Sequence, residues 1–189
     1  MKRFFLIAAM AVFSVAATAQ NLTFAYVDFN ELVQLMPEMD SARETLDAAS
    51  KEAQETYMAM MEEYQTKAQQ FQQKQATWTQ AIKDSKANEL QQIEYRIQEF
   101  QQAVQQELQQ TQQNLQAPIY EKAQKAVSDL AKSKGVAFVF EKGSLLYFDP
   151  AQSVDLTPEA RVALNIPEGR TLETLQAELQ AKAQAAQAQ

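Results

Sequence analysis

The sequence predicts an α+β protein in which a long antiparallel two-helix coiled-coil arm projects from a small β body that assembles as an oligomer. Three observations support this prediction. A central segment, about 38–134, contains no Gly and one Pro, and it is rich in Ala, Glu, Lys and Gln. Short aromatic and β-branched runs lie on either side of it. The chain has no Cys, so disulfides cannot stabilise the body.

Composition divides the chain into four parts. Residues 1–19 are predicted to be a cleaved secretory signal peptide, because a positive start precedes a short apolar run and a small-residue cleavage site. Residues 38–130 form the predicted arm, while 20–37 and 131–170 form a discontinuous, oligomerising β body. Residues 171–189 are expected to be a helical or frayed tail. A secreted chain of this kind is expected in the periplasm.

Apolar residues recur every three or four positions along two stretches of the central segment. The first comprises Tyr57, Met60, Tyr64, Ala68, Phe71, Gln75, Trp78 and Ile82. The second comprises Leu90, Ile93, Ile97, Phe100, Val104, Leu108, Thr111 and Leu115. Each series takes seven steps over 25 residues, as expected of a helix that buries one stripe against a single partner helix. These seam residues are therefore expected to form the core of the arm.

A polar segment between the two stretches, 84–88, predicts where the chain reverses. Its Asp, Ser and Asn residues favour caps and turns over helix interiors, and Asn88 with Gln91 resembles a capping box. A reversal here predicts that the numbers of facing residues sum to 171 or 172. Pro118 is expected to kink the second helix. Whether that kink is merely tolerated or acts as a hinge stays open.

The body is expected to contain a β-hairpin. Val136–Phe140 and Leu145–Phe148 flank a Gly-containing turn. Both runs are apolar on both faces, so both faces should be covered. A body of this size without disulfides is marginal as a monomer, and self-association is the expected remedy. The side chains expected in the oligomeric body are Tyr26, Val27, Phe138, Val139, Phe140, Leu146 and Phe148.

Residue types that the chain lacks limit its chemistry. With no His, no Cys and three Gly, it cannot build Ser-His-acid triads, Cys nucleophiles, the commonest zinc sites or Gly-rich phosphate loops. We therefore expect no enzyme activity, no catalytic or metal site and no cofactor. The formal charge is -7, or -7 - 2 = -9 after loss of Lys2 and Arg3. That charge is unfavourable for nucleic-acid binding.

Two segments resemble a known family. They are AYVDFNELVQLMPE near the start and GVAFVFEKGSLLYFDP followed by VDLT near the end. In this order, around a long hairpin, they resemble the Skp family, also called the OmpH family, over about 22–165. The resemblance implies a homotrimer whose three arms enclose a cavity. It also implies ATP-independent binding of unfolded outer-membrane β-barrel proteins in the periplasm.

Client contacts are expected from apolar residues off the seam, and Met58, Met61 and Tyr95 are the candidates. Flexible Met and scattered aromatic side chains repack against varied sequences. That these three are incidental exposed residues stays an open alternative. The best-known family member is strongly basic, so contact of this acidic chain with membrane surfaces or lipopolysaccharide is also left open. The alternative function is a coiled-coil envelope spacer or scaffold.

Overall fold

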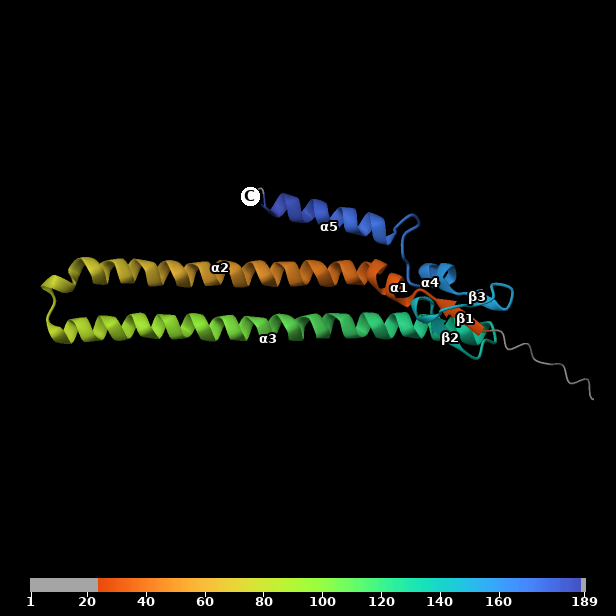
Figure 1. Ribbon diagram of the computed structural model, residues 1–189, viewed down its shortest axis with the longest axis horizontal. Coiled ribbons are helices and arrows are strands. Elements are labelled where there is room, and N and C mark those ends of the chain that lie inside the picture. The colour runs from red at the N-terminus through yellow and green to blue at the C-terminus, as the bar shows by residue number, and fades with distance from the viewer. Residues whose placement is uncertain (1–23, 188–189) are drawn as a thin grey trace, which may run out of the picture.

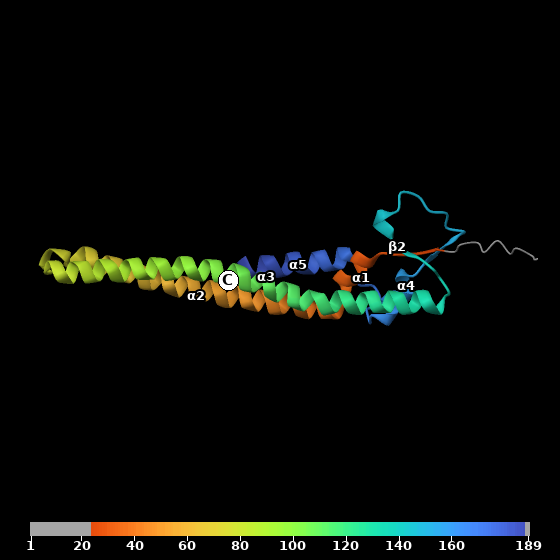
Figure 2. The same ribbon diagram turned by 90° about the horizontal axis from the view of Figure 1, so that it is seen from below.

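The computed structural model describes residues 24–187 and shows a long two-helix arm with a small body at one end (Figure 1). The predicted signal peptide, residues 1–19, lies outside this range. The two arm helices are α2, Pro37–Lys74, and α3, Gln80–Ser133. They run side by side in opposite directions in both views (Figures 1 and 2). The fold class predicted from the sequence is therefore confirmed for the single chain.

The chain reverses at residues 75–79, nine residues earlier than 84–88. Helix α2 is followed by a short 3-10 helix, η1, over Gln75–Thr77. Trp78 is extended, and the hydroxyl of Thr79 caps α3 by accepting a hydrogen bond from the backbone N–H of Ile82 at 3.4 Å. The predicted reversal at 84–88 is wrong, because that segment lies inside α3.

Local chemistry explains the position of the reversal. Thr77, Trp78 and Thr79 are β-branched or aromatic, and such side chains lose rotamer freedom in a helix. The Trp78 ring also packs edge-on against Phe71, with ring centroids 5.8 Å apart. Three consecutive poor helix formers thus coincide with a tertiary contact that fixes the turn.

The earlier reversal changes the register of the arm. Contacts between the helices join Tyr64 to Glu94 and Glu63 to Arg96, so the paired numbers sum to 158 and 159. At the base, Glu38 bonds to Lys122, a sum of 160. The predicted sum of 171 or 172 is therefore wrong by about 171 - 158 = 13 residues. A pair such as Ala49 and Ala123 does not face across the arm.

The predicted apolar stripes are nevertheless present. Ile93 and Ile97 are buried, with 2% and 9% of their surfaces exposed. The other seam positions from Tyr57 to Phe71 and from Leu90 to Leu115 are at least partly buried. Near the reversal the stripe fades, since Gln75 is exposed and Ile82 is 43% exposed. Helix α3 continues through Pro118 without interruption.

The body contains a three-stranded parallel sheet. Strand β1, Phe24–Val27, lies between β2, Val139–Glu141, and β3, Ser153–Asp155. Ala25 pairs with Val139 on one side and with Val154 on the other. The whole arm is thus the crossover connection between β1 and β2, as parallel pairing requires a long connection.

The predicted β-hairpin is wrong. After β2, residues Lys142–Ser144 form a 3-10 helix, η2, and 145–148 join no strand. The chain instead turns at Asp149, whose backbone carbonyl accepts from the N–H of Gln152 at 3.0 Å and from the hydroxyl of Ser153 at 2.9 Å. The second outer strand therefore forms at Ser153–Asp155, a segment with only one apolar residue.

The core of the body lies between the sheet and the base of the arm. Helix α1, Phe29–Leu35, begins at Asp28, whose carboxylate accepts from the N–H of Glu31 at 3.0 Å. The buried cluster joins residues of β1, α1, the arm base and α4, Thr157–Ala163. Its fully buried large members are Leu32, Leu35, Met36, Leu156, Leu164 and Val33.

The predicted tail forms helix α5, Leu172–Gln187. It starts at the body and runs beside the arm toward the tip (Figure 1). Leu175 is 5% exposed and belongs to the body core, whereas Leu172 and Leu179 are about 40% exposed. Arg170 anchors the start of this helix to the arm base through Asp40 at 2.7 Å.

Candidate functional site

One face of the sheet carries a cluster of aromatic side chains. Along β1, Ala25 and Val27 are buried in the core, so the alternating Phe24 and Tyr26 lie on the other face. This aromatic face comprises Phe24, Tyr26, Phe138, Phe140 and Phe148. Phe140 contacts Phe24 and Phe138, with ring centroids 5.9 and 6.4 Å apart, and Tyr26 contacts Phe148 at 4.5 Å. Phe138 and Phe140 are 55% and 43% exposed. The protomer thus leaves large apolar side chains in water.

The residues predicted for the oligomeric body divide between two faces. Tyr26, Phe138, Phe140 and Phe148 belong to the aromatic face. Val27 is buried in the core of the protomer, and Val139 packs partly buried against it. Leu146 is fully exposed on the segment between β2 and β3, next to Tyr147, which is 83% exposed. These last two side chains project from the body with no cover within the described chain.

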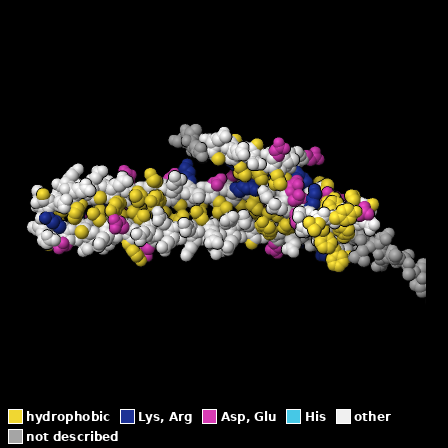
Figure 3. Space-filling model, in the orientation of Figure 1, with side chains coloured by type: hydrophobic (Ala, Val, Ile, Leu, Met, Phe, Trp, Pro, Cys, Tyr) yellow, Lys and Arg dark blue, Asp and Glu magenta, His cyan; other side chains and the backbone are white. Residues whose placement is uncertain are grey.

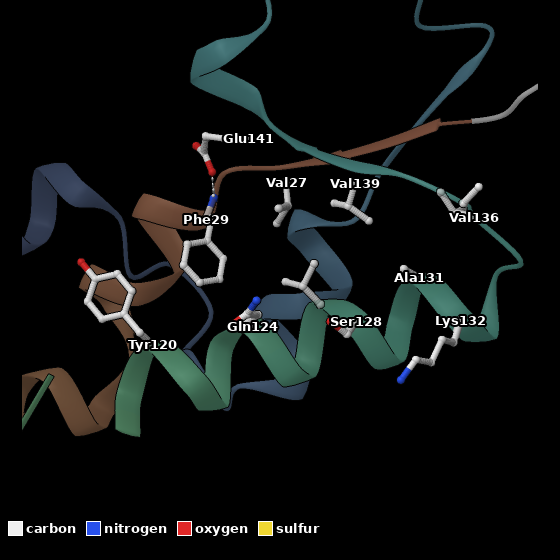
Figure 4. Close-up of a pocket in the computed structure, with 12 residues that line it drawn as sticks. Val27, Phe29, Tyr120, Gln124, Ser128, Ala131, Lys132, Val136, Val139 and Glu141 are labelled. Atoms are coloured by element: carbon white, nitrogen blue, oxygen red, sulfur yellow. Dashed lines mark hydrogen bonds between the residues drawn. The ribbon is translucent and has the colours of Figure 1, made fainter. Parts of the chain in front are cut away.

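An open apolar pocket of about 690 Å³ lies on the opposite side of the sheet, against α3 (Figure 4). Val27, Val127 and Val139 form part of its wall, and Phe29 and Tyr120 close one end. The Glu141 carboxylate accepts a hydrogen bond from the backbone N–H of Phe29 at 2.9 Å, which fixes the rim. The lining of this pocket is mainly apolar, so it suits an apolar group more than a charged ligand.

The predicted client-binding residues lie on two different parts of the arm. Met58 and Met61 line one shallow depression of about 660 Å³ on α2. Tyr95 lines a separate depression on α3 with neighbours such as Asn88 and Arg96. Met58 and Tyr95 are 60% and 61% exposed. The structure therefore makes these side chains accessible without joining them into one site.

A further apolar surface lies along the middle of the seam, where sequence reasoning expected only core. Ala53, Phe100, Val104 and Leu108 line two grooves, one of about 200 Å³ and one of about 420 Å³. Apolar side chains are visible between the two helices along the arm in Figure 3. The signal that could have found this surface is the small size of Ala49 and Ala53, once the register is known.

Ion pairs connect the helices mainly toward the tip. Lys67 and Lys86 both bond to the Glu89 carboxylate, and these hydrogen bonds lower its pKa to about 2. Arg96 bonds to Glu63 at 3.1 Å. The Tyr64 hydroxyl donates to Glu94 at 2.6 Å, which raises the pKa of that tyrosine. These groups are all partly or largely exposed to solvent, so they set the register more than they stabilise the arm.

The described residues, 24–187, contain no cluster of acidic side chains suited to a metal ion, and the chain has no His or Cys. Over the same range, each helix is too short or too polar to traverse a bilayer. The surfaces that remain as candidates are therefore the aromatic face, the body pocket and the apolar parts of the arm.

Comparison with known proteins agrees with this architecture. A sequence search of curated proteins found no match. Among solved structures, the chain is similar to a crystal structure from Caulobacter crescentus CB15 described as a putative outer membrane chaperone (OmpH-like). The TM-score is 0.65 at 16% sequence identity, covering 75% of this chain and 82% of that one. The sequence model of the OmpH-like outer membrane protein family matches residues 23–164. The chain therefore belongs to the OmpH-like family.

Proposed function

We propose that this protein is an ATP-independent holding chaperone of the periplasm, which binds unfolded outer-membrane β-barrel proteins and prevents their aggregation. The observation that carries the proposal is a long arm that exposes apolar side chains along its length while the body supplies its own small core. Membership of the OmpH-like family supports it, as does the similarity to the Caulobacter crescentus structure described as a putative outer membrane chaperone.

A chaperone that binds and releases unfolded proteins without ATP requires many weak apolar contacts instead of one tight binding pocket. The arm provides them in separate places: Met58 and Met61 on α2, Tyr95 on α3, and the grooves beside Phe100. Met and aromatic side chains adapt to different partners at low cost. The protein would therefore delay aggregation of an unfolded chain without selecting one folded shape.

The proposal includes assembly into a homotrimer through the body. Phe138 and Phe140 are about half exposed on the aromatic face, and Leu146 and Tyr147 project nearby. The outer strands β2 and β3 each pair on one side only within the described chain. Exposed apolar surface and open strand edges of this kind mark interaction surfaces. Three copies would cover these surfaces and point three arms in one direction around a cavity.

An aggregation assay tests the holding function. An unfolded outer-membrane β-barrel protein is diluted from urea into buffer with and without the full chain lacking residues 1–19, and light scattering is followed. We expect the protein to suppress scattering near one assembly per client without added ATP. Unchanged scattering at a tenfold excess would contradict the proposal and favour the spacer or scaffold function.

Assembly is tested separately by light scattering of the purified protein. Phe138→Asp should yield smaller species with unchanged helical content, because this ring is exposed in the protomer and its replacement leaves the core intact. Val162→Asp is the matched control, since Val162 is 76% exposed on α4 and is not part of the aromatic face. A wild-type protein that is monomeric at micromolar concentration would refute the trimer.

A further inference from the structure

We infer that the middle of the arm is a binding site for extended polypeptide segments that combine apolar side chains with Lys or Arg. We call this part the mid-arm window and define it as residues 47–60 of α2 and 98–111 of α3, which face each other because 47 + 111 and 60 + 98 both equal 158, the sum given by Tyr64 and Glu94. The inference rests on the proposed holding function and assigns it a place and a preferred client chemistry.

Packing in the mid-arm window differs from packing on either side of it. Toward the tip, Ile93 and Ile97 are 2% and 9% exposed, and toward the base Ile119 and Ala123 are 5% and 0% exposed. Every seam residue of α3 between those two zones is only partly buried; these are Phe100, Val104, Leu108, Thr111 and Leu115. The arm thus has two closed zones with a loose zone between them.

Side-chain size explains the loose zone. Ala53 is the residue of α2 that lines both grooves, whereas α3 lines both with the larger Phe100, Val104 and Leu108. Small residues on one helix cannot fill the spaces between large ones on the other, and a groove remains on each side of the seam. The two grooves share four residues, so apolar surface continues through the seam from one side of the arm to the other.

Charge indicates what occupies these grooves. The mid-arm window carries five carboxylates, Asp47, Glu52, Glu55, Glu99 and Glu107, against one cation, Lys51, a balance of 1 - 5 = -4. Within residues 24–187, none of these five forms a salt bridge, in contrast to Glu63 and Glu89 toward the tip. Glu52 and Glu107 line the smaller groove from its two walls. A partner with cations beside its apolar side chains complements this surface.

The dimensions suit an extended chain. Fourteen helical residues span about 20 Å at 1.5 Å each, which about six extended residues cover at roughly 3.3 Å each. In an extended chain, neighbouring side chains alternate between two directions. Apolar side chains can therefore enter a groove while the intervening Lys or Arg side chains reach Glu52 and Glu107 at its walls.

The first test fills the groove. Ala53→Leu places a larger apolar side chain where both grooves meet, and Ala103→Leu, at an exposed position of α3 that lines neither groove, is the matched control. The probe is a fluorescent peptide of about eight residues that alternates Leu or Phe with Lys, long enough to span the mid-arm window. We expect Ala53→Leu to weaken binding about tenfold, roughly the effect of losing one buried apolar side chain. Ala103→Leu should bind like wild type.

The second test reverses the charge and does not depend on packing. Glu52→Lys with Glu107→Lys changes two exposed positions, so the helices are retained. Wild type should prefer the Lys peptide to a matched peptide with Glu in place of Lys, and the double variant should reverse this preference. A third peptide, with Ser in place of Leu and Phe, should bind neither protein.

The outcomes separate this inference from the proposed function. If wild type suppresses aggregation of an unfolded β-barrel protein but Ala53→Leu binds the Lys peptide as well as Ala103→Leu does, the mid-arm window is not the site. An unchanged peptide preference in the charge-reversed variant would likewise overturn the inference. If wild type suppresses no aggregation at all, the holding function itself fails, whatever the peptides show.

Discussion

Replacing Ile93 and Leu108 by Ala should cost the arm unequal amounts of stability. Ile93 is 2% exposed, so Ile93→Ala removes three fully buried carbon atoms and leaves a cavity. At about 0.8 kcal/mol per methylene plus a cavity cost, the expected loss is about 3 kcal/mol. Leu108 borders two grooves and is only partly buried. Leu108→Ala should therefore cost about half as much, roughly 1.5 kcal/mol.

The assay is urea unfolding followed by circular dichroism at 222 nm, at one fixed protein concentration because self-association shifts apparent stability. The midpoint and slope of each variant give the free energy of unfolding. Equal losses for Ile93→Ala and Leu108→Ala would refute the reasoning, since they would mean that the mid-arm window is packed as tightly as the zone around Ile93. A loss below about 1 kcal/mol for Ile93→Ala would show that the buried isoleucines do not hold the arm together.

Three other predictions follow from the register, the tip and the tail. Cys residues placed at Ala53 and Val104, which line the same two grooves, should form a disulfide under mild oxidation, whereas a pair at Ala49 and Ala123 should stay reduced. The pKa of Glu89 is lowered from 4.5 to about 2, so its stabilising effect is present above pH 4.5 and is lost as the pH falls through about 2. In an NMR titration the Glu89 carboxyl should titrate near 2, and Lys67→Ala with Lys86→Ala should return its pKa toward 4.5. Leu175→Ala should speed amide hydrogen exchange throughout α5 while α3 stays protected, because Leu175 joins α5 to the buried body cluster. Unchanged exchange would show that α5 is held by other contacts.

The sequence was sufficient to predict the two helices and the faces that they bury. The spacing of residues such as Ile93, Ile97 and Phe100 is a local property of one helix. An apolar stripe with this period must be buried against some partner, and the stripe is visible in the sequence before the partner is known. The buried or partly buried positions on α2 and α3 match that stripe. The two faces of β1 were not predicted: Tyr26 and Val27 were both expected in the oligomeric body, whereas Val27 is buried in the core and Tyr26 lies on the aromatic face.

Register was not determined by the stripe. Measured from the predicted sum of 172, the shift is 172 - 158 = 14 residues. That is about four helical turns, or two heptads, so apolar residues still meet apolar residues after it. The polar segment 84–88 carried a plausible turn signal, but exposed polar residues are also tolerated inside a helix. The decision came from Thr79 as the cap and from Trp78 against Phe71, and the second of these is a tertiary contact.

The sequence also did not specify which segments pair in the sheet. Leu145–Phe148 has the composition of a strand, yet the weaker segment Ser153–Asp155 takes the position beside β1. Short runs do not specify their partners, because pairing depends on which edge is open and on the crossover that reaches it. Here β2 takes one edge of β1 and leaves the other to β3.

By itself the sequence determined what had to be buried: two stripes along an α-helical arm, and the apolar side chains of a body too small to cover all of them. Only the tertiary structure determined which of these apolar surfaces pack against each other. It set the register that places Ala49 and Ala53 opposite larger residues of α3 and so opens the mid-arm window. Burial follows from the period of the side chains along one element, whereas a groove depends on the difference in size between two elements, which is fixed only when they are aligned.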